Sequence, residues 1–391
     1  MLALAGGIAL ASALAATYPP RRPGPLAFAG FMAAWLASEL APQVTLLVGT
    51  LAGVGVAKGG LWTTTGLIGL ALTPVYLPTL LAGPRDAEHA LATARHALDL
   101  AIPTSLRRPA WAWPLFFVHA SRASDCETAS YGPDRHHRLD LHRPAAASIA
   151  SPRGRLIYVH GGGWVLGFRR WQGRLLFRRL LAEGWEVASV GYRLAPRATW
   201  PEPLDDVRRA ITWLDARWPN DGAPTFLAGN SAGAQLAARI AFAADGWPIK
   251  ARPLSGCLAF YGVHDLLDRH GHWPHGSLRL LWERLIAKRP LATAQPLFAD
   301  ASPIEHALTA RDSDRRLPPT LLIHGDRDTL VPPAESRALA AVHRDVVLIE
   351  VPGAQHAFDV LWSHRALAGA AIAATWLSAR AEQSQPPTAP A

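Results

Sequence analysis

The 391-residue chain has little cysteine, few charged residues and no block of basic residues. Its two cysteines, Cys126 and Cys257, are too few for a disulfide framework and lie in no cluster of potential metal ligands. Charged residues make up 18% of the chain, and the net charge of +9 comes mostly from scattered arginines. Because no lysine- or arginine-rich stretch with interleaved aromatics is present, we expect no nucleic-acid partner. Half of the residues are apolar, which indicates a packed core together with segments compatible with a membrane.

The first 84 residues hold four apolar stretches, which are Leu2–Thr17, Leu26–Leu40, Val44–Ala57 and Leu61–Ala82. A spanning helix needs about 20 apolar residues, so only the last stretch is long enough by itself. The first stretch also fits a buried helix or a secretory signal, but it lacks the positively charged start of a signal. We therefore predict that residues 1–84 form roughly two to four membrane spans, with membrane lipid as a partner. This places the protein in a membrane as a multi-pass protein, in a bacterial inner membrane, and leaves its orientation open.

Residues 229–233 read G-N-S-A-G and follow the apolar run Thr225–Ala228. The pattern G-x-S-x-G is typical of a sharp turn from a buried strand into a helix, which exposes the serine hydroxyl, here that of Ser231. Glycine is expected on both sides because a Cβ would clash in so tight a turn. The helix expected from Ala232 to about residue 244 points its free amides at the serine and favours a developing negative charge there. A glycine-flanked serine also occurs in ordinary turns, so the rest of the chain must decide between these interpretations.

A second apolar run, Leu156–Val159, ends in a loop that reads H-G-G-G-W over residues 160–164. Three successive glycines leave backbone N–H groups exposed and allow a substrate to approach closely. Together with the amide of Ala232, such a loop can donate hydrogen bonds to the oxyanion of a tetrahedral intermediate. A flexible turn and a phosphate cradle are the alternatives. The cradle is disfavoured because no Lys-Ser or Lys-Thr follows the glycines.

Two further apolar runs each lead into a loop with a potential catalytic side chain. Thr320–Ile323 precedes Asp326 and Asp328, and Val346–Val351 precedes His356. Asp328 lies further into its loop, where it can turn towards a histidine, whereas Asp326 is better placed to brace the loop. His356 is favoured among sixteen histidines by its position, since serine, aspartate and histidine then follow three strands in that order. A serine hydroxyl becomes a good nucleophile when a neutral imidazole accepts its proton and a carboxylate orients that imidazole.

These motifs resemble those of the hormone-sensitive-lipase family of α/β-hydrolases, the bacterial esterases and lipases with an HGGG loop. The resemblance spans roughly Leu139–Leu377 and is carried by His160–Trp164, Tyr192–Pro196, Pro201–Val207, Gly229–Gly233, His324–Asp328 and Gly353–Phe358. Through it we expect Ser231 to be the nucleophile, Asp328 the acid and His356 the base.

The resemblance also implies that Gly162, Gly163 and Ala232 form the oxyanion hole, and that no cofactor and no metal ion is needed. It assigns Tyr192–Pro196 a supporting place beside the site. The chain departs from the family pattern at two positions: Asn230 stands where aspartate is common, and Arg197 stands where glutamate is usual.

Short buried strands that alternate with amphipathic helices predict an α/β fold with a mostly parallel sheet covered by helices on both faces. With the resemblance, this indicates an α/β-hydrolase fold over residues 138–380, a helical cap insertion at about 262–317, and N-terminal transmembrane helices. We expect a connector or part of the cap at 85–137, where Trp111–Phe117 fits a membrane-surface belt and packing under the cap equally well. Residues 381–391 are expected to be a disordered tail.

Taken together, the sequence predicts a membrane-anchored serine carboxylesterase or lipase that hydrolyses lipophilic esters through an acyl-enzyme. Acylglycerols, acetylated lipids and steryl esters fit the expected membrane location. An acyltransferase that uses the same acyl-enzyme is one alternative, and a non-catalytic ligand-binding protein on a hydrolase fold is another. Acyl-chain length, the alcohol of the substrate and the oligomeric state stay open.

Overall fold

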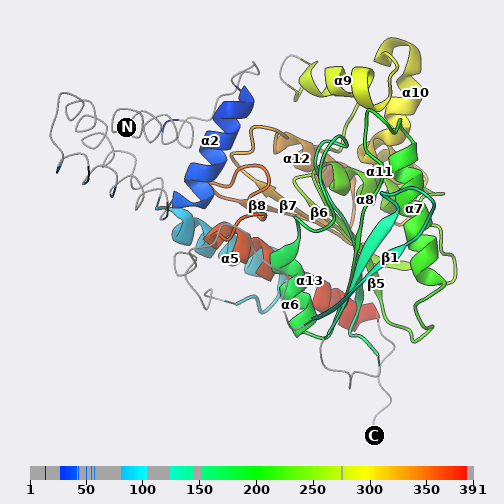
Figure 1. Ribbon diagram of the computed structural model, residues 1–391, viewed down its shortest axis with the longest axis horizontal. Coiled ribbons are helices and arrows are strands. Elements are labelled where there is room, and N and C mark those ends of the chain that lie inside the picture. The colour runs from blue at the N-terminus through cyan, green and yellow to red at the C-terminus, as the bar shows by residue number, and fades with distance from the viewer. Residues whose placement is uncertain are drawn as a thin grey trace, which may run out of the picture.

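The computed structural model describes residues 27–41, 81–103, 124–144, 151–273 and 276–384, and the single positions 14, 43, 50, 54 and 57. Its centre is an eight-stranded sheet with the strand order β1-β2-β4-β3-β5-β6-β7-β8 (Figure 1). The strands are β1 (Ser124–Ser130), β2 (Arg138–Pro144), β3 (Arg155–Val159), β4 (Glu186–Val190), β5 (Thr225–Asn230), β6 (Leu254–Phe260), β7 (Thr320–Gly325) and β8 (Val346–Val351).

Strands β3 to β8 run parallel to one another, whereas β2 is antiparallel to both β1 and β4, and β1 and β2 form one edge of the sheet. Every residue of β3, β5 and β7 is buried, as expected for strands covered on both faces. The side chains of β3 alternate between the two covered faces: Leu156 and Tyr158 join one core cluster, and Ile157 and Val159 join another.

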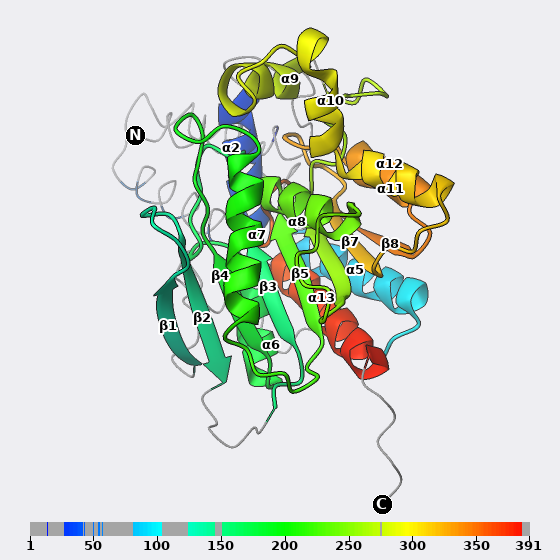
Figure 2. The ribbon, with the colours of Figure 1, turned by 90° about the vertical axis from the view of Figure 1, so that its right-hand side faces the viewer.

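Helices cover both faces of this sheet. One face carries α5 (Gly83–Leu98), α6 (Arg174–Ala182) and α13 (His364–Ser384). The other face carries α7 (Glu202–Asp215), α8 (Ala232–Phe242), α11 (Pro303–Asp312) and α12 (Ala334–Val342) (Figure 2). The predicted mostly parallel sheet with helices on both faces is confirmed.

A cap of short helices lies beyond the carboxyl ends of the strands (Figure 2). It consists of α9 (Ser277–Leu281), the π-helix η3 (Trp282–Ile286) and α10 (Leu291–Ala301). Trp282 anchors it, because this fully buried ring packs against the rings of Trp164, Trp200 and Phe298. These helices fall within residues 262–317, the range expected for the insertion. Its last part, α11, packs instead against α8 and α12 and covers the sheet.

The N-terminal boundaries differ from those expected. Strand β1 and helix α5 belong to the hydrolase sheet and its helical layer, so this unit begins before residue 138. The polar sequence of β1 explains why the strand was not predicted, since an edge strand with an exposed side needs no apolar run. At the other end α13 continues to Ser384, because Ala381 is buried, so the expected tail 381–391 starts inside a helix.

Only one of the four apolar N-terminal stretches forms a described helix, α2 (Ala27–Glu39), which has 13 residues. Instead of standing apart, α2 packs on the hydrolase core: the Trp35 indole donates to the Ala357 carbonyl, and Ser363 donates to Glu39. No helix within the described residues is both long and apolar enough to cross a membrane. The other three stretches, isolated positions apart, and the aromatic run 111–117 lie outside the described residues.

Candidate active site

The turn from β5 into α8 holds Ser231 in a backbone conformation that side chains rarely adopt, with φ 53° and ψ −118°. The glycines on either side are sterically required. A Cβ on Gly229 would lie 2.3 Å from the carbonyl oxygen of Gly233, and a Cβ on Gly233 would lie 2.1 Å from that of Val159. The chain therefore makes the sharp strand-to-helix turn that the sequence predicts, with Ser231 at its bend.

A hydrogen-bond chain joins the three side chains that the sequence predicts as a triad. The Ser231 Oγ lies 3.0 Å from Nε2 of His356, and Nδ1 of His356 lies 2.6 Å from Oδ2 of Asp328. All three residues are less than 10% exposed. They follow β5, β8 and β7 at the same edge of the sheet, where parallel strands place their loops. The structure therefore brings together residues that lie far apart in the sequence.

The environment of Asp328 keeps its side chain ionised. Its Oδ1 accepts hydrogen bonds from the backbone amides of Leu330 and Val331 at 2.9 and 2.8 Å. Burial alone would raise the pKa of this carboxyl, but the facing His356 and the hydrogen bonds from His324 and His356 lower it to about 2. The carboxylate can thus hold the proton of His356 on Nδ1 and leave Nε2 free to accept one.

Asp326, the competing aspartate, does not reach the histidine ring. Its Oδ1 accepts a hydrogen bond from the backbone amide of Gly353 at 2.7 Å, and burial raises the pKa of its carboxyl. It thereby ties its own loop to the loop that carries His356. The geometry places Asp328 in contact with His356 and gives Asp326 a bracing position.

The glycine-rich loop packs directly against the serine turn. A Cβ on Gly161 would lie 2.6 Å from the Asn230 carbonyl oxygen and 3.1 Å from the Cβ of Ser231. Within the described part of the chain, the backbone N–H groups of Gly162, Gly163 and Ala232 have no hydrogen-bond acceptor. Unpaired amides beside a serine hydroxyl are available to an oxygen that develops negative charge there.

His160 and Tyr192 support the glycine loop from behind. Their rings stack with centroids 4.4 Å apart, and the Tyr192 hydroxyl donates to the His160 carbonyl oxygen at 3.0 Å. Burial lowers the pKa of His160 to about 4, so this ring is neutral and acts in packing. The amide of Gly161 donates to Gln172 Oε1 at 2.6 Å, which fixes the start of the loop. Tyr192 thus lies beside the site, as the resemblance implies.

Two aromatic rings that the sequence did not predict for the site pack against His356. The Tyr261 ring, at the end of β6, lies with its centroid 4.6 Å from that of His356. The Phe31 ring of α2 presents an edge at 6.4 Å. No local signal pointed to Phe31, because its apolar stretch was predicted to span a membrane. Aromatic rings thus form part of the surroundings of the histidine.

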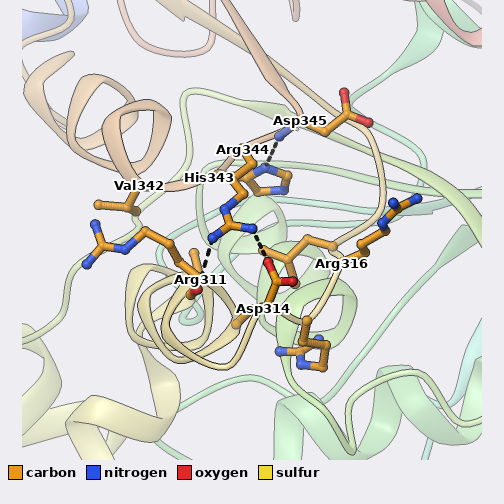
Figure 3. Close-up of a pocket in the computed structure, with 11 residues that line it drawn as sticks. Arg311, Asp314, Arg316, Val342, His343, Arg344 and Asp345 are labelled. Carbon is orange, nitrogen blue, oxygen red and sulfur yellow. Dashed lines mark hydrogen bonds and ion pairs between the residues drawn. The ribbon is translucent and has the colours of Figure 1, made fainter.

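A cavity lies elsewhere, between α11 and the starts of β7 and β8 (Figure 3). Its volume is about 330 Å³, and arginines dominate its lining, among them Arg311, Arg316 and Arg344. Asp328 and His356 follow the opposite ends of β7 and β8, so this cavity is remote from the hydrogen-bonded serine. In the described ranges no group of three or more His, Cys, Asp or Glu side chains is arranged to hold a metal ion.

Several proteins to which the chain is similar are named as esterases. The chain is 32% identical to Esterase LipQ of Mycobacterium tuberculosis over 257 residues, which cover 62% of this chain and 59% of LipQ. It is 35% identical to Esterase LipC of the same organism over 246 residues, or 59% of each chain. The chain thus spans about three fifths of the length of these relatives.

Solved structures share the fold. Esterase B from Lactobacillus Rhamnosis matches with a TM-score of 0.54 and 21% identity, over 68% of this chain and 91% of that one. A bacterial heroin esterase matches with a TM-score of 0.51 and 22% identity, over 66% of this chain and 85% of that one. A family model described as the alpha/beta hydrolase fold matches residues 156–360, more than half of the chain. The chain belongs to the α/β-hydrolase family.

Proposed function

We propose that the protein is a membrane-anchored serine carboxylesterase that hydrolyses lipophilic carboxylic esters. The observation that carries this proposal is the hydrogen-bond chain from Ser231 through His356 to Asp328. The names of the curated relatives, LipQ and LipC as esterases and LipM as a probable carboxylic ester hydrolase, support the same reaction class.

The reaction begins when Nε2 of His356 takes the proton of the Ser231 hydroxyl while Oγ attacks the ester carbonyl. Asp328 stabilises the imidazolium that forms. The amides of Gly162, Gly163 and Ala232 donate to the carbonyl oxygen as it becomes an oxyanion, each contributing about 3 kcal/mol by the usual cost of losing one donor. His356 then protonates the departing alcohol, which leaves an acyl-enzyme on Ser231. Water, deprotonated by the same histidine, releases the acid.

The lipophilic character of the substrate is inferred from the surroundings of the histidine. Phe31 lies on one side of it, and the cap brings Leu281 within 4.0 Å of the position that a Cβ on Gly163 would take. The membrane anchor is inferred from the apolar stretches of residues 1–84. If the full chain stays in the membrane fraction after an alkaline carbonate wash, anchoring is supported; its release would contradict anchoring and leave the esterase proposal untouched.

Hydrolysis of p-nitrophenyl esters from acetate to palmitate by the detergent-solubilised full chain tests the reaction. Ser231→Ala should abolish turnover, while Ser313→Ala, which changes an exposed serine far from the turn, should not. Folded protein without activity on any ester would contradict the proposal. If an alcohol acceptor is added, acyl transfer would appear as an acylated alcohol among the products. If no acylated alcohol forms, the enzyme is restricted to hydrolysis.

A further inference from the structure

A buried carboxylate that the proposed mechanism does not use lies behind the serine turn. Asp359 follows His356 by three residues and is only 8% exposed. Its Oδ2 accepts a hydrogen bond from the Asn230 amide at 2.7 Å, and its Oδ1 accepts one from the Tyr261 hydroxyl. Buried carboxylates are costly unless such donors compensate for the lost water, so this position requires an explanation.

The hydrogen bonds around Asp359 form a network in which each donor leads towards the Asp359 carboxyl group. The Tyr158 hydroxyl donates to Oδ1 of Asn230, and the Asn230 Nδ2 donates to the hydroxyl oxygen of Tyr261 and to Asp359. The Tyr261 hydroxyl in turn donates a hydrogen bond to Oδ1 of Asp359. Burial raises the pKa of Asp359, and the hydrogen bonds from Tyr261 and Asn230 oppose that rise. Two donors that face a carboxyl group stabilise its ionised form.

This network explains the amide at position 230. A carboxylate there would face Asp359 across 2.7 Å, and two carboxylates so close cannot both stay ionised. The amide nitrogen removes this conflict and donates in two directions. The negative charge beside the serine turn is thus supplied from position 359, on the loop of the histidine.

Asp359 also acts on the histidine through Tyr261. The Tyr261 hydroxyl is hydrogen-bonded to Asp359, and the centroid of the Tyr261 ring lies 4.6 Å from that of the His356 ring. Two negative side chains act on His356, namely Asp328 in direct contact and Asp359 behind Tyr261, whose hydroxyl is neutral. When His356 takes the serine proton, it becomes a cation that interacts with both buried charges. Low local polarity makes such an interaction effective.

We propose that Asp359, held by Asn230 and Tyr261, is a positioning residue that fixes the Tyr261 ring against His356 and stabilises its imidazolium. The inference rests on the proposed esterase function. It does not make Asp359 a catalytic residue, because its carboxylate touches neither the serine hydroxyl nor the histidine ring.

The test measures kcat/KM against pH, together with thermal unfolding, for the full chain carrying Asp359→Asn, Asn230→Asp or both. Asp359→Asn should lower kcat/KM roughly 10- to 100-fold, part of the ~10²–10⁴-fold that a general base supplies. Because a negative charge near the imidazolium is lost, the acid limb of the kcat/KM profile should shift to lower pH by about half to one pH unit. Asn230→Asp should also lower kcat/KM. The double variant, which exchanges amide and carboxylate, should recover to within about fivefold of the unmodified chain and restore the acid limb.

Three outcomes would overturn the inference. The first is wild-type kinetics in Asp359→Asn. The second is a loss of activity in Asp359→Asn that only follows the unfolded fraction, with no shift of the acid limb. The third is a double variant whose kcat/KM is no higher than that of the single variants. Tyr261→Phe keeps the ring but removes the hydrogen bond through which Asp359 holds it, so wild-type kinetics in this variant would also contradict the inference. Asp345→Asn, at the opposite end of the sheet, is the control. An unmodified chain without esterase activity would instead refute the proposed function.

Discussion

Replacing Asp328 with asparagine tests the geometry of the triad through a change of one atom. The amides of Leu330 and Val331 donate to Oδ1 of Asp328, so an asparagine keeps its oxygen at that position. Its NH₂ group must then replace Oδ2, which lies 2.6 Å from Nδ1 of His356. A donor now faces Nδ1, and this forces the ring proton onto Nε2, where the serine proton has to go.

The expected cost follows from that wrong tautomer. A triad that loses its oriented base in this way typically loses about 10⁴ in kcat, which corresponds to roughly 5.4 kcal/mol at 1.36 kcal/mol per factor of ten. Stability should fall less than turnover, because both backbone hydrogen bonds survive and only the contact of Oδ2 with His324 is lost besides that with His356. The assay is kcat for p-nitrophenyl butyrate, with thermal unfolding as the measure of folding.

Asp326→Asn is the matched control, two residues away in the same loop. Asparagine can keep the hydrogen bond from the Gly353 amide, so kcat should stay within about threefold of the original value. If Asp326→Asn loses orders of magnitude in kcat while Asp328→Asn remains active, the roles of the two aspartates are reversed. The interpretation of the Asp328 contacts would then be wrong.

Three further changes probe the fold and the surroundings of the site. Both ring nitrogens of buried His264 lack a hydrogen-bond partner within the described chain, and burial lowers its pKa from 6.5 to about 3. The unfolded chain therefore binds a proton below pH 6.5 that the folded chain does not bind. His264 should account for about 2 kcal/mol of the stability that urea unfolding shows to be lost by pH 5, and the loss in His264→Leu should be smaller by that amount. Gly233→Ala should lower the free energy of unfolding by at least about 3 kcal/mol, because the new Cβ would lie 2.1 and 2.4 Å from backbone oxygens. Gly222→Ala, which has open space around it at a φ of +74°, should lower it by about 1 kcal/mol. Equal losses in the two variants would contradict the tight turn. Phe31→Ala should raise KM for palmitate esters about tenfold and leave acetate esters unchanged, and an equal effect on both would exclude Phe31 from the acyl site.

Short apolar runs in the sequence predicted several of the strands and helices correctly. The helix predicted to begin at Ala232 forms α8, which begins at that residue. The four runs that precede the glycine loop, Ser231, Asp328 and His356 are strands β3, β5, β7 and β8. Buried parallel strands bury both faces, so their apolar runs are visible in the sequence without any partner.

The parts that sequence reasoning missed depend on contacts between distant segments. Helix α2 is apolar on most sides, and such a helix fits a bilayer as well as a protein interior, so only its contacts with Ala357 and Ser363 place it on the core. Asp359 and Asn230 are 129 residues apart, and no spacing rule links them. Asn230 was visible only as a departure from a family pattern, and its reason becomes clear when Asp359 is seen beside it.

The central claim, that Ser231 is the nucleophile of an acyl-enzyme, is tested most directly by covalent labelling. The full chain is treated with a fluorophosphonate probe, and the modified peptide is identified by mass spectrometry in the original protein, in Ser231→Ala and in His356→Ala. We expect a single adduct on Ser231, none in Ser231→Ala, and labelling slowed by orders of magnitude in His356→Ala, because the serine then lacks its base. An adduct on another residue, or ester hydrolysis that persists in Ser231→Ala, would contradict the mechanism.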